Sequence, residues 1–321
     1  MRGTMGSAHP RPVVPCMRSL FLLMFPREST LDWSAEPAVP GGLKVFWGGR
    51  DSCEVGSEML KEVTQAMNVK QLFDLTGRVA VVTGGSIGLG RQMAEGLAEM
   101  GANLVLCARK KERCEQAAKE LQALGVRTLA LGCDVKDPLG VQGLVDATIS
   151  QFGRIDILIN NAGISWGAPI EEMRLEHWNK VMETNLTGTF LCCQAVGKFM
   201  SAQKRGTIIN IASTAGLRGA PPEFQAIGYQ ASKGGVIAFT KDLARKWAIH
   251  NIRVNAIAPG WFPTHMSEVV IERNRANFLK GIPLGRFGSD HDLKGAAVFL
   301  ASDASDFVTG DVLVVDGGQS A

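Results

Sequence analysis

The sequence has little that could cross-link the chain or hold a metal ion. Its seven cysteines are an odd number without a CxxC pair, so disulfide bonds are not expected and a reducing, cytoplasmic location fits best. The five histidines are isolated, with none at metal-ligand spacing, so no catalytic metal is expected. A chain of 321 residues can build a stable hydrophobic core without disulfide bonds or a bound metal ion.

Long apolar runs and a strong charge of one sign are also missing. The apolar run Leu20–Phe25 is too short to cross a bilayer, and shorter than the ~7 to 15 residue core of a signal peptide. The net charge is only +3, and basic residues alternate with acidic ones along the expected helices. Neither a membrane nor a nucleic acid is therefore a predicted partner.

Residues 1–70 differ in composition from the rest of the chain. Six of the thirteen prolines lie within the first forty positions, and no periodic core pattern is present, which predicts a poorly ordered extension. A transit peptide is disfavoured because acidic residues, such as Asp32 and Glu36, interrupt the basic ones. Met59 and Met67 lie shortly before residue 71, which suggests the hypothesis of a start codon placed too far upstream.

Residues 71–321 alternate apolar, β-type runs with amphipathic segments, joined by short polar or glycine-bearing turns. This pattern is typical of one α/β domain with a parallel sheet. The seven expected strands are Val79–Thr83, Asn103–Cys107, Thr128–Leu131, Ile155–Asn160, Gly206–Ile211, Arg253–Ala258 and Val312–Val315. The expected covering helices include Arg91–Met100, Glu112–Leu124, Val141–Phe152, Leu175–Met200 and Tyr229–Ile249.

The single tyrosine of the chain, Tyr229, is followed four positions later by Lys233, so the two share one face of a helix. A phenol titrates near pH ~10 in water, and a nearby ammonium that favours the phenolate makes it useful for proton transfer at neutral pH. Taken alone, such a pair is more often a packed tyrosine beside a solvated lysine. The other motifs of the sequence decide between these interpretations.

A glycine-rich turn, Thr83–Gly90, follows the first expected strand and leads into a helix. Missing side chains allow the backbone to approach a phosphate at the positive end of that helix. Several nucleotide folds and plain tight turns share such a stretch, so the turn needs support from other motifs. Support comes from Asn160–Gly163 at the end of the fourth strand, Asn185 in the next helix and Ser213 just past the fifth strand.

Together these motifs resemble the short-chain dehydrogenase/reductase family. Thr83–Gly90 is similar to its TGxxxGxG turn and Asn160–Gly163 to its NNAG motif. The family's tetrad is matched by Asn185, Ser213, Tyr229 and Lys233, and Pro259-Gly260 with Thr264 also matches. The resemblance runs from about residue 73 to the C-terminus. It implies a Rossmann-type, doubly wound parallel sheet of about seven strands with helices on both faces, and an oxidoreductase that reduces a carbonyl to a secondary alcohol or the reverse.

By this resemblance, Tyr229 is expected to give a proton to a substrate carbonyl oxygen and to take the alcohol proton in the reverse direction. Ser213 is expected to hydrogen-bond the same oxygen. Lys233 is expected to lower the pKa of the tyrosine and to hold the nicotinamide ribose, and Asn185 to position a water that links the lysine to solvent. Taken singly, Ser213 is an ordinary loop hydroxyl and Asn185 a helix interruption that bonds its own backbone.

The resemblance also assigns a set of cofactor-binding residues, among which Asp134 is expected to contact the adenine. They are Gly84, Ser86, Ile87, Gly88, Gly90, Arg109, Asp134, Val135, Asn161, Ala162, Gly163, Tyr229, Lys233, Pro259, Gly260, Phe262 and Thr264.

The choice of nicotinamide cofactor depends on the end of the second strand, where an acidic residue binds ribose hydroxyls and a basic one binds a 2′-phosphate. Ala108 stands where an NAD-binding member of the family carries aspartate, and Arg109 follows. NADP(H) is therefore the preferred cofactor and NAD(H) the alternative. Many NADP-dependent relatives carry an arginine at the position of Ile87, which weakens the preference. The other interpretation of Arg109–Lys111 is a solvated helix start, although cations there oppose the helix dipole.

Three loops are expected over the carboxyl ends of the strands, at Ile164–Ile170, Thr214–Gly228 and Gly260–Leu284. Their large apolar residues either wall a substrate pocket or pack beneath a lid. These residues are Trp166, Phe224, Trp261, Phe262 and Met266.

The sixteen positions from Ser213 to Tyr229 exceed the spacing common in the family, so the substrate entrance is expected to be reshaped. This loop resembles that of gluconate 5-dehydrogenase-like and 3-oxoacyl-[acyl-carrier-protein] reductase-like members. The substrate is then a keto sugar acid or a 3-oxoacyl thioester. Arg218 either receives an anionic substrate group or faces water, and the second interpretation is slightly favoured.

Two classes of function follow. The first is an NADP(H)-preferring carbonyl reductase or alcohol dehydrogenase with a small-molecule substrate. As in relatives, its helices Leu175–Met200 and Tyr229–Ile249 are expected to form a dimer face in a homotetramer or homodimer. The second class is a dinucleotide-binding sensor or scaffold without turnover, for which a damaged tetrad is expected. The tetrad is intact, which favours the enzyme.

Overall fold

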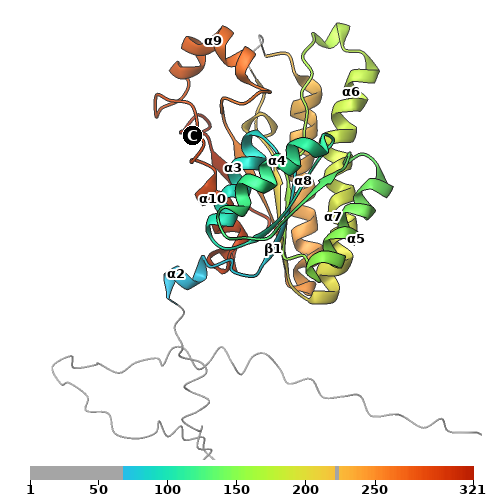
Figure 1. The fold of residues 1–321 in the computed structure, drawn as a ribbon. Helices are drawn as coiled ribbons and strands as arrows, with labels where there is room; N and C mark the ends of the chain where they lie inside the picture. The colour runs from blue at the N-terminus through green and yellow to red at the C-terminus, as the bar shows by residue number, and fades with distance from the viewer. Residues whose placement is uncertain (1–67, 221–223) are drawn as a thin grey trace, which may run out of the picture. The chain divides into compact units, whose positions relative to one another are not determined.

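The computed structural model describes residues 68–220 and 224–321. Its seven strands form one parallel sheet in the order β3-β2-β1-β4-β5-β6-β7 (Figure 1). The strands are β1 Val79–Thr83, β2 Asn103–Ala108, β3 Thr128–Gly132, β4 Ile157–Asn160, β5 Gly206–Ile211, β6 Ile252–Pro259 and β7 Val312–Val315. The predicted sheet is confirmed, and the strand ends differ from the predicted ones by two residues at most.

The predicted N-terminal extension, residues 1–70, lies almost entirely outside the described residues. Its last residues belong to the short helix α2 Val69–Leu72. Asn68 caps this helix: its Oδ1 accepts from the Lys70 N–H, and its own N–H donates to Gln71 Oε1, which satisfies two backbone N–H groups at the helix start.

Helices cover both faces of the sheet, and the strands are apolar on both sides as a result. On one face pack α3 Gly88–Glu99, α4 Lys111–Gln122 and α10 Lys294–Ala301, and on the other α5 Pro138–Phe152, α7 Gly188–Gln203 and α8 Ile227–Trp247. Alternate residues of β1 pack against the two layers of helices. Ala80 and Val82 face the layer with α3, and Val79 and Val81 face the layer with α7. A strand buried on both faces reads as a continuous apolar run, which is why its position could be predicted.

The order of the strands fixes where a ligand can bind. The chain runs outward from β1 through β2 to β3, then crosses back to β4 on the other side of β1. The connections after β1 and β4 therefore leave the sheet in opposite directions, which opens a crevice at their carboxyl ends. Figure 1 shows α9 Glu268–Lys280 and α6 Leu175–Met182 at one end of the sheet.

Three helical segments differ from the sequence prediction. The helix expected at Leu175–Met200 is divided into α6, a π-helical turn η4 Glu183–Thr187, and α7. The segment Gly260–Leu284, expected as a loop, contains α9, which buries only Ile271 and so lacks an apolar stripe in its sequence. Helix α10 was not predicted because its short, almost wholly apolar sequence has no amphipathic period.

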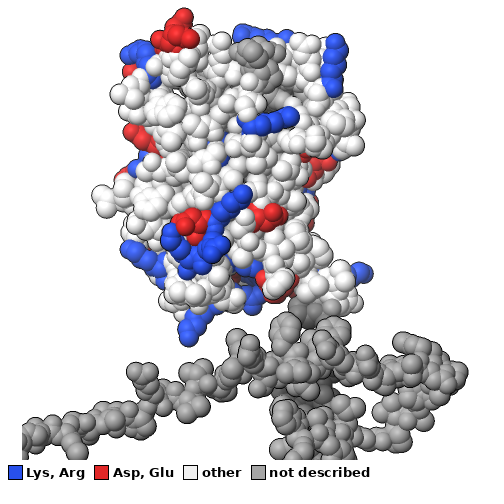
Figure 2. All heavy atoms as spheres, turned by 180° about the vertical axis from the view of Figure 1, so that it is seen from behind, with Lys and Arg blue, Asp and Glu red and all other residues white. Residues whose placement is uncertain are grey.

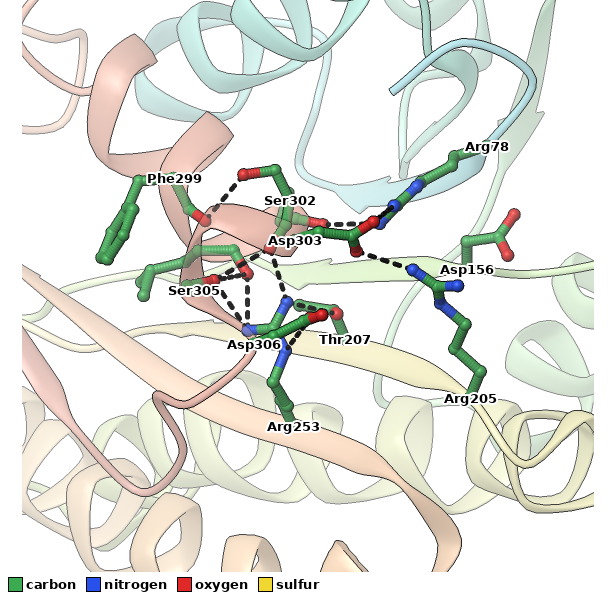
Figure 3. A network of polar contacts seen from close by, with 12 residues as sticks. Arg78, Asp156, Arg205, Thr207, Arg253, Phe299, Ser302, Asp303, Ser305 and Asp306 are labelled. Carbon is green, nitrogen blue, oxygen red and sulfur yellow. Dashed lines mark hydrogen bonds and ion pairs between the residues drawn. The ribbon is translucent and has the colours of Figure 1, made fainter. Parts of the chain in front are cut away.

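The amino end of the sheet carries a buried polar network (Figure 3). Arg253, 8% exposed at the start of β6, donates to Thr207 Oγ1 at 3.1 Å and to Ser305 Oγ at 2.8 Å. It also donates to the main-chain oxygens of Leu300 and Ser302, at 3.1 and 2.9 Å. Ser305 Oγ donates to the same two main-chain oxygens, at 3.1 Å each. With its four hydrogen bonds the guanidinium fastens β5 and β6 to the segment that follows α10.

A second part of the same network joins the start of β1 to that segment. Figure 3 shows Asp303 between Arg78 and Arg205, with an N–O distance of 2.6 Å to each guanidinium. The side chains of Arg78 and Asp303 are less than one fifth exposed, so water screens this ion pair only partly. The network therefore concentrates stabilising contacts at the edge of the sheet away from the carboxyl ends.

Basic and acidic side chains lie beside one another on the lower part of the face in Figure 2, as the alternating signs in the sequence suggest. In the part of the chain that the structure describes, no helix has both the length and the apolar character to span a bilayer.

Candidate active site

A cavity of about 1650 Å³ opens at the carboxyl ends of β1, β2, β4, β5 and β6. It is lined by every residue that the sequence predicted for catalysis or cofactor binding, except Gly90 and Asn185. A cavity of this size exceeds the range of about 300 to 1,000 Å³ of ordinary small-molecule pockets, which suits a dinucleotide together with a substrate.

The glycine-rich turn forms one wall of the cavity. Gly84 and Gly88 have φ angles of +63° and +57°, which residues with a side chain rarely adopt. Ile87, at the N-cap of α3, offers no side-chain hydrogen bond to the first turn of that helix. The first turn therefore presents backbone N–H groups and the positive end of the helix dipole, which favours an anion such as a phosphate.

Gly90 lies behind this turn rather than in the cavity. A Cβ atom there would lie 2.4 Å from both Asn161 Nδ2 and the main-chain oxygen of Gly84. Asn161 Nδ2 donates to the main-chain oxygens of Thr83 and Gly84 at 3.0 and 3.1 Å, and Thr83 Oγ1 accepts from the main-chain N–H groups of Asn161 and Ala162. These hydrogen bonds join the glycine-rich turn to the Asn160–Gly163 motif, and the missing side chain of Gly90 permits their close approach.

The preceding asparagine, Asn160, is a structural residue. It is 4% exposed and donates to Asn210 Oδ1 at 2.9 Å, while Asn210 donates to Thr240 Oγ1 at 2.9 Å. These contacts link β4, β5 and α8 beneath the cavity, so Asn160 supports the site without lining it.

Ser213, Tyr229 and Lys233 meet at the cavity. Ser213 follows β5 and is hydrogen-bonded to the Tyr229 phenol, and it also accepts from the Ala215 N–H at 3.2 Å. Tyr229 and Lys233 lie one helical turn apart in α8, with Lys233 Nζ 5.7 Å from the centroid of the tyrosine ring. Lys233 is 4% exposed and donates to the main-chain oxygen of Ile211 at 2.5 Å.

The electrostatics of this group differ from the expectation that Lys233 lowers the pKa of the tyrosine. Burial raises the pKa of Tyr229, and the hydrogen bond with Ser213 only partly opposes that rise. Burial also lowers the pKa of Lys233, to about 8 from its ordinary 10.5, because the charged form is poorly solvated. The predicted lowering is therefore wrong for this structure: burial dominates, and Ser213 rather than Lys233 is the group that favours the phenolate.

Asn185 lies in the π-helical turn η4, behind the residues that line the cavity. It is 1% exposed; its Oδ1 accepts from the Ile164 N–H at 2.8 Å, and its Nδ2 donates to Ile164 O and to Ser232 Oγ, both at 2.9 Å. It is thus a helix interruption that bonds another segment rather than its own backbone. A Cβ on Gly163 would lie 3.3 Å from Asn185 Oδ1 and 3.7 Å from Lys233 Nζ, so Asn185 lies close to the lysine.

Basic side chains gather at the end of the cavity beyond β2. Arg109, Lys110 and Arg113 line it, are exposed, and have no ion pair with any described residue. Arg113 was not predicted; it lies in the first turn of α4, whereas Arg109 precedes the helix, and the cavity brings the two together. Lys111, by contrast, pairs with Glu115 at 3.2 Å and is not among the lining residues.

Asp134 and Val135, after β3, line the same region. Asp134 Oδ1 accepts from the Lys136 N–H at 3.1 Å, which fixes its turn. Val135 packs against α7, where a Cβ on Gly188 would lie 2.6 Å from Val135 Cγ2.

The segment after β6 contributes the opposite boundary of the cavity. Pro259 ends the strand, and a Cβ on Gly260 would lie 2.6 Å from the Cβ of Asp316, which explains the glycine. Thr264 lies against the glycine-rich turn, since a Cβ on Gly88 would be 3.6 Å from Thr264 Cγ2. Phe262 lines the cavity but is only 5% exposed and belongs mainly to the core.

The expected apolar wall is present in part. Phe224, Trp261, Phe262 and Met266 line the cavity. Trp261 stacks on Phe278 of α9, with ring centroids 4.2 Å apart, and Phe224 meets its edge at 5.5 Å. Trp166 is not among the lining residues; its ring stacks on His177 at 3.7 Å, so for this residue the packing interpretation holds.

Comparison with known proteins agrees with this geometry. A family model described as Enoyl-(Acyl carrier protein) reductase matches residues 84–320. A 3-oxoacyl-[acyl-carrier-protein] reductase of Staphylococcus aureus is 40% identical over 241 residues, which cover 75% of this chain and 97% of the relative. A gluconate 5-dehydrogenase of Gluconobacter oxydans is 42% identical over 254 residues, covering 78% of this chain and 98% of the relative.

A solved structure shares the fold as well. The gluconate 5-dehydrogenase of Burkholderia cenocepacia, in complex with NADP and tartrate, superposes with a TM-score of 0.75 at 37% identity. The match covers 79% of this chain and 99% of that protein.

Proposed function

The chain belongs to the short-chain dehydrogenase/reductase family, whose members here are oxidoreductases acting on CH–OH groups, and on that premise we propose that it interconverts a carbonyl and a secondary alcohol with NADP(H). The observation that carries the proposal is the hydrogen-bonded pair Ser213 and Tyr229, with Lys233 one turn away, in the same cavity as the glycine-rich turn. When bound, the nicotinamide supplies or accepts the hydride. Tyr229 then supplies or removes the proton on the substrate oxygen.

In this proposal each residue of the group has a separate task. Ser213 holds the substrate oxygen and stabilises the phenolate form of Tyr229. Lys233, buried and bonded to Ile211 O, holds the cofactor ribose beside that oxygen. Asn185 keeps the Ile164 backbone in place and supports the water chain that leads away from the lysine. Preorganised donors of this kind stabilise charge that develops on the oxygen during reaction.

The residues that would hold the cofactor fit an anionic dinucleotide. The uncapped start of α3 and the left-handed glycines accommodate the pyrophosphate. Arg109 and Arg113 suit a 2′-phosphate, and the similar enzyme of Burkholderia cenocepacia was solved with NADP, which supports NADP(H) over NAD(H). Asp134 and Val135 remain proposed as the adenine contacts.

The substrate we propose is a keto sugar acid or a 3-oxoacyl thioester, the two classes named among the similar proteins. We further propose a homotetramer or homodimer. Phe190 of α7 is 43% exposed and meets the edge of Phe239 of α8, with centroids 6.5 Å apart, which is an apolar patch on the helices expected at a dimer face. The cytoplasmic location stays a prediction from the sequence.

The test is oxidation of NADPH and NADH with a panel of carbonyls, comparing wild type with Tyr229→Phe. The panel contains 5-ketogluconate, an acetoacetyl thioester and a cyclic ketone. We expect turnover with NADPH that falls by about 10²-fold or more in the variant, because the group that moves the proton is lost, while NADPH still binds through the remaining cofactor contacts. Tight NADPH binding without any turnover would instead favour the sensor.

A further inference from the structure

Charged residues are distributed unevenly along the cavity. Arg109, Lys110 and Arg113 stand at the end beyond β2, where the 2′-phosphate is proposed to lie. In the described lining there is one carboxylate, Asp134, and it follows β3 on that same side. Among residues 212–220, 224–226 and α9, the part of the lining on this side contains a single arginine, Arg218, and no acidic residue.

Arg218 comes from a turn that is fixed beside the catalytic group. It lies two residues after Gly216, the end of the short helix η5 Thr214–Gly216. A Cβ on Gly216 would lie 2.6 Å from the main-chain carbon of Lys233, so this turn packs directly on α8 at the lysine. Ser213 Oγ also accepts from the Ala215 N–H, which ties the turn to the residue that meets Tyr229.

The guanidinium of Arg218 is exposed, and it forms no hydrogen bond or ion pair with residues 68–220 or 224–321. A cation at the mouth of a cavity attracts an anion where, as in the described lining on this side, no carboxylate neutralises it. A guanidinium matches a carboxylate with two parallel hydrogen bonds.

The rest of this side of the cavity has polar side chains that are neither carboxylates nor arginines among the described residues. Asn274 and Asn277 of α9 line it, together with His265 in the preceding segment. Amide groups both donate and accept hydrogen bonds, so they suit hydroxyl groups on a substrate. The aromatic pair Trp261 and Phe278 offers a flat apolar surface beside them.

We propose that Arg218 binds the carboxylate of the substrate and so selects a hydroxy or keto carboxylic acid. This inference rests on the function proposed above and chooses between its two substrate classes. A 3-oxoacyl thioester has no carboxylate near its reacting carbonyl, and its charges lie on the carrier arm, remote from the residues around Ser213. A sugar acid carries both the carboxylate and the hydroxyl groups that the lining can receive.

Binding of carboxylates to the cofactor-loaded protein tests the proposal without turnover. Calorimetric titrations use D-gluconate, tartrate and the neutral polyol D-glucitol with the NADPH-loaded protein, and 5-ketogluconate with the NADP⁺-loaded protein, so that no pair can exchange a hydride. We expect Arg218→Gln to weaken carboxylate binding by about tenfold or more and to leave D-glucitol unchanged. Arg218→Lys should recover part of the loss, because it keeps the charge but not the paired geometry. Added salt should weaken carboxylate binding to wild type more than to Arg218→Gln.

Arg273→Gln is the matched control, because Arg273 is exposed on α9 and is absent from the cavity lining. It removes the same charge and is expected to leave every affinity within about twofold. Equal carboxylate binding by wild type and Arg218→Gln would overturn the proposal, and so would the absence of binding by all three carboxylates.

Kinetics separate this inference from the function on which it rests. Wild type that reduces an acetoacetyl thioester but no keto acid would leave the reductase intact and refute the role of Arg218. Carboxylate binding that depends on Arg218, without turnover of any carbonyl, would keep the anion site and refute the reductase. The expected result is that Arg218→Gln raises KM for 5-ketogluconate and leaves the kinetics of a neutral cyclic ketone unchanged.

Discussion

Lys233 Nζ and the ring of Tyr229 lie 5.7 Å apart, centroid to nitrogen, and the lysine gives its hydrogen bond to Ile211 O instead of to the phenol. The polar partner of the phenol is Ser213. The protonation of Tyr229 is therefore governed by burial, which raises its pKa, and by Ser213, which lowers it. The pH dependence of the reaction should therefore change when Ser213 is replaced.

Replacing Ser213 with alanine is expected to raise the pKa of Tyr229 further, because the opposing hydrogen bond is lost. Alcohol oxidation requires the phenolate, so the rising limb of its rate against pH should move to higher pH, with a rate about 10²-fold lower at neutral pH. The measurement is a pH profile of kcat for oxidation. Ser165→Ala removes another hydroxyl from the cavity lining and should leave the limb in place. An unshifted limb in Ser213→Ala would contradict the assignment.

Lys233 makes stability depend on pH in a window above neutrality. Its pKa is about 8 in the folded protein and ordinarily 10.5, so between these values the unfolded chain binds more protons than the folded one. Stability contributed by this group therefore rises with pH from about 8 to 10.5. The free energy of unfolding of wild type minus that of Lys233→Met should grow by about 1 to 3 kcal/mol across the window, measured by urea denaturation. A constant difference would show that burial does not shift the lysine.

The preference for NADPH over NADH should depend on Arg109 and Arg113 and not on Lys111. The double variant Arg109→Gln with Arg113→Gln is expected to raise KM for NADPH by about tenfold or more, because charged contacts to the 2′-phosphate are lost, and to leave KM for NADH unchanged. Lys111→Gln is the control, since Lys111 pairs with Glu115 and is not among the lining residues. An equal rise of KM for NADPH and for NADH would show that the two arginines do not contact the 2′-phosphate.

The network in Figure 3 predicts a strong effect on stability without one on chemistry. Arg253→Met would remove four buried hydrogen bonds of the guanidinium and its ion pair with Asp306, so the free energy of unfolding should fall by about 3 to 5 kcal/mol. Arg174→Gln, which breaks an exposed pair with Glu176, should cost less than about 1 kcal/mol. Urea denaturation measures both. The kinetics of folded Arg253→Met, assayed at low temperature, should match wild type because the cavity lies at the other edge of the sheet.

Cys133 is expected to be the first described cysteine to react with an alkylating reagent. A hydrogen bond with Cys107 lowers the pKa of the Cys133 thiol, whereas burial raises that of Cys193 to about 12. Because the thiolate is the nucleophile and Cys133 lines the cavity, NADPH should slow its modification several-fold. Peptide mass spectrometry after timed iodoacetamide treatment resolves each site, with Cys133→Ala as the blank. Modification of Cys133 at the same rate with and without NADPH would contradict its place in the cofactor region.

The parallel sheet was predictable because its strands are buried on both sides, and a short continuous apolar run such as Val79–Val82, bounded by turn residues, is typical of such a strand. The glycines of the turn after β1 were predictable from simple sterics. Helix α9 was not predictable, since it packs mainly against Trp261 and residues after β6, in a small cluster separate from the main core. A helix that buries one side chain fully leaves almost no period in its sequence.

The sequence was similarly limited in what it predicted about the candidate site. The sequence placed Tyr229 and Lys233 on one helix face, but not the depth of burial that moves both pKa values toward the neutral forms. That depth depends on the β5 and η5 segments that cover α8, which come from an earlier part of the chain. The choice left open for Trp166 has the same origin, because its stacking on His177 is a contact that no spacing rule identifies.

The π-helical turn at Asn185 has a consequence for chain length. Such a turn contains one residue more than an α-helix needs, so deleting one residue from Glu183–Thr187 would restore regular helical hydrogen bonds. Because the wide turn absorbs the extra residue, the same deletion would keep Cys192 and Val196 on the face of α7 that packs on the sheet. It would instead displace the Asn185 amide from Ile164 and Ser232, which it now joins. A deletion within Glu183–Thr187 should consequently disturb the site behind the cavity more than the fold.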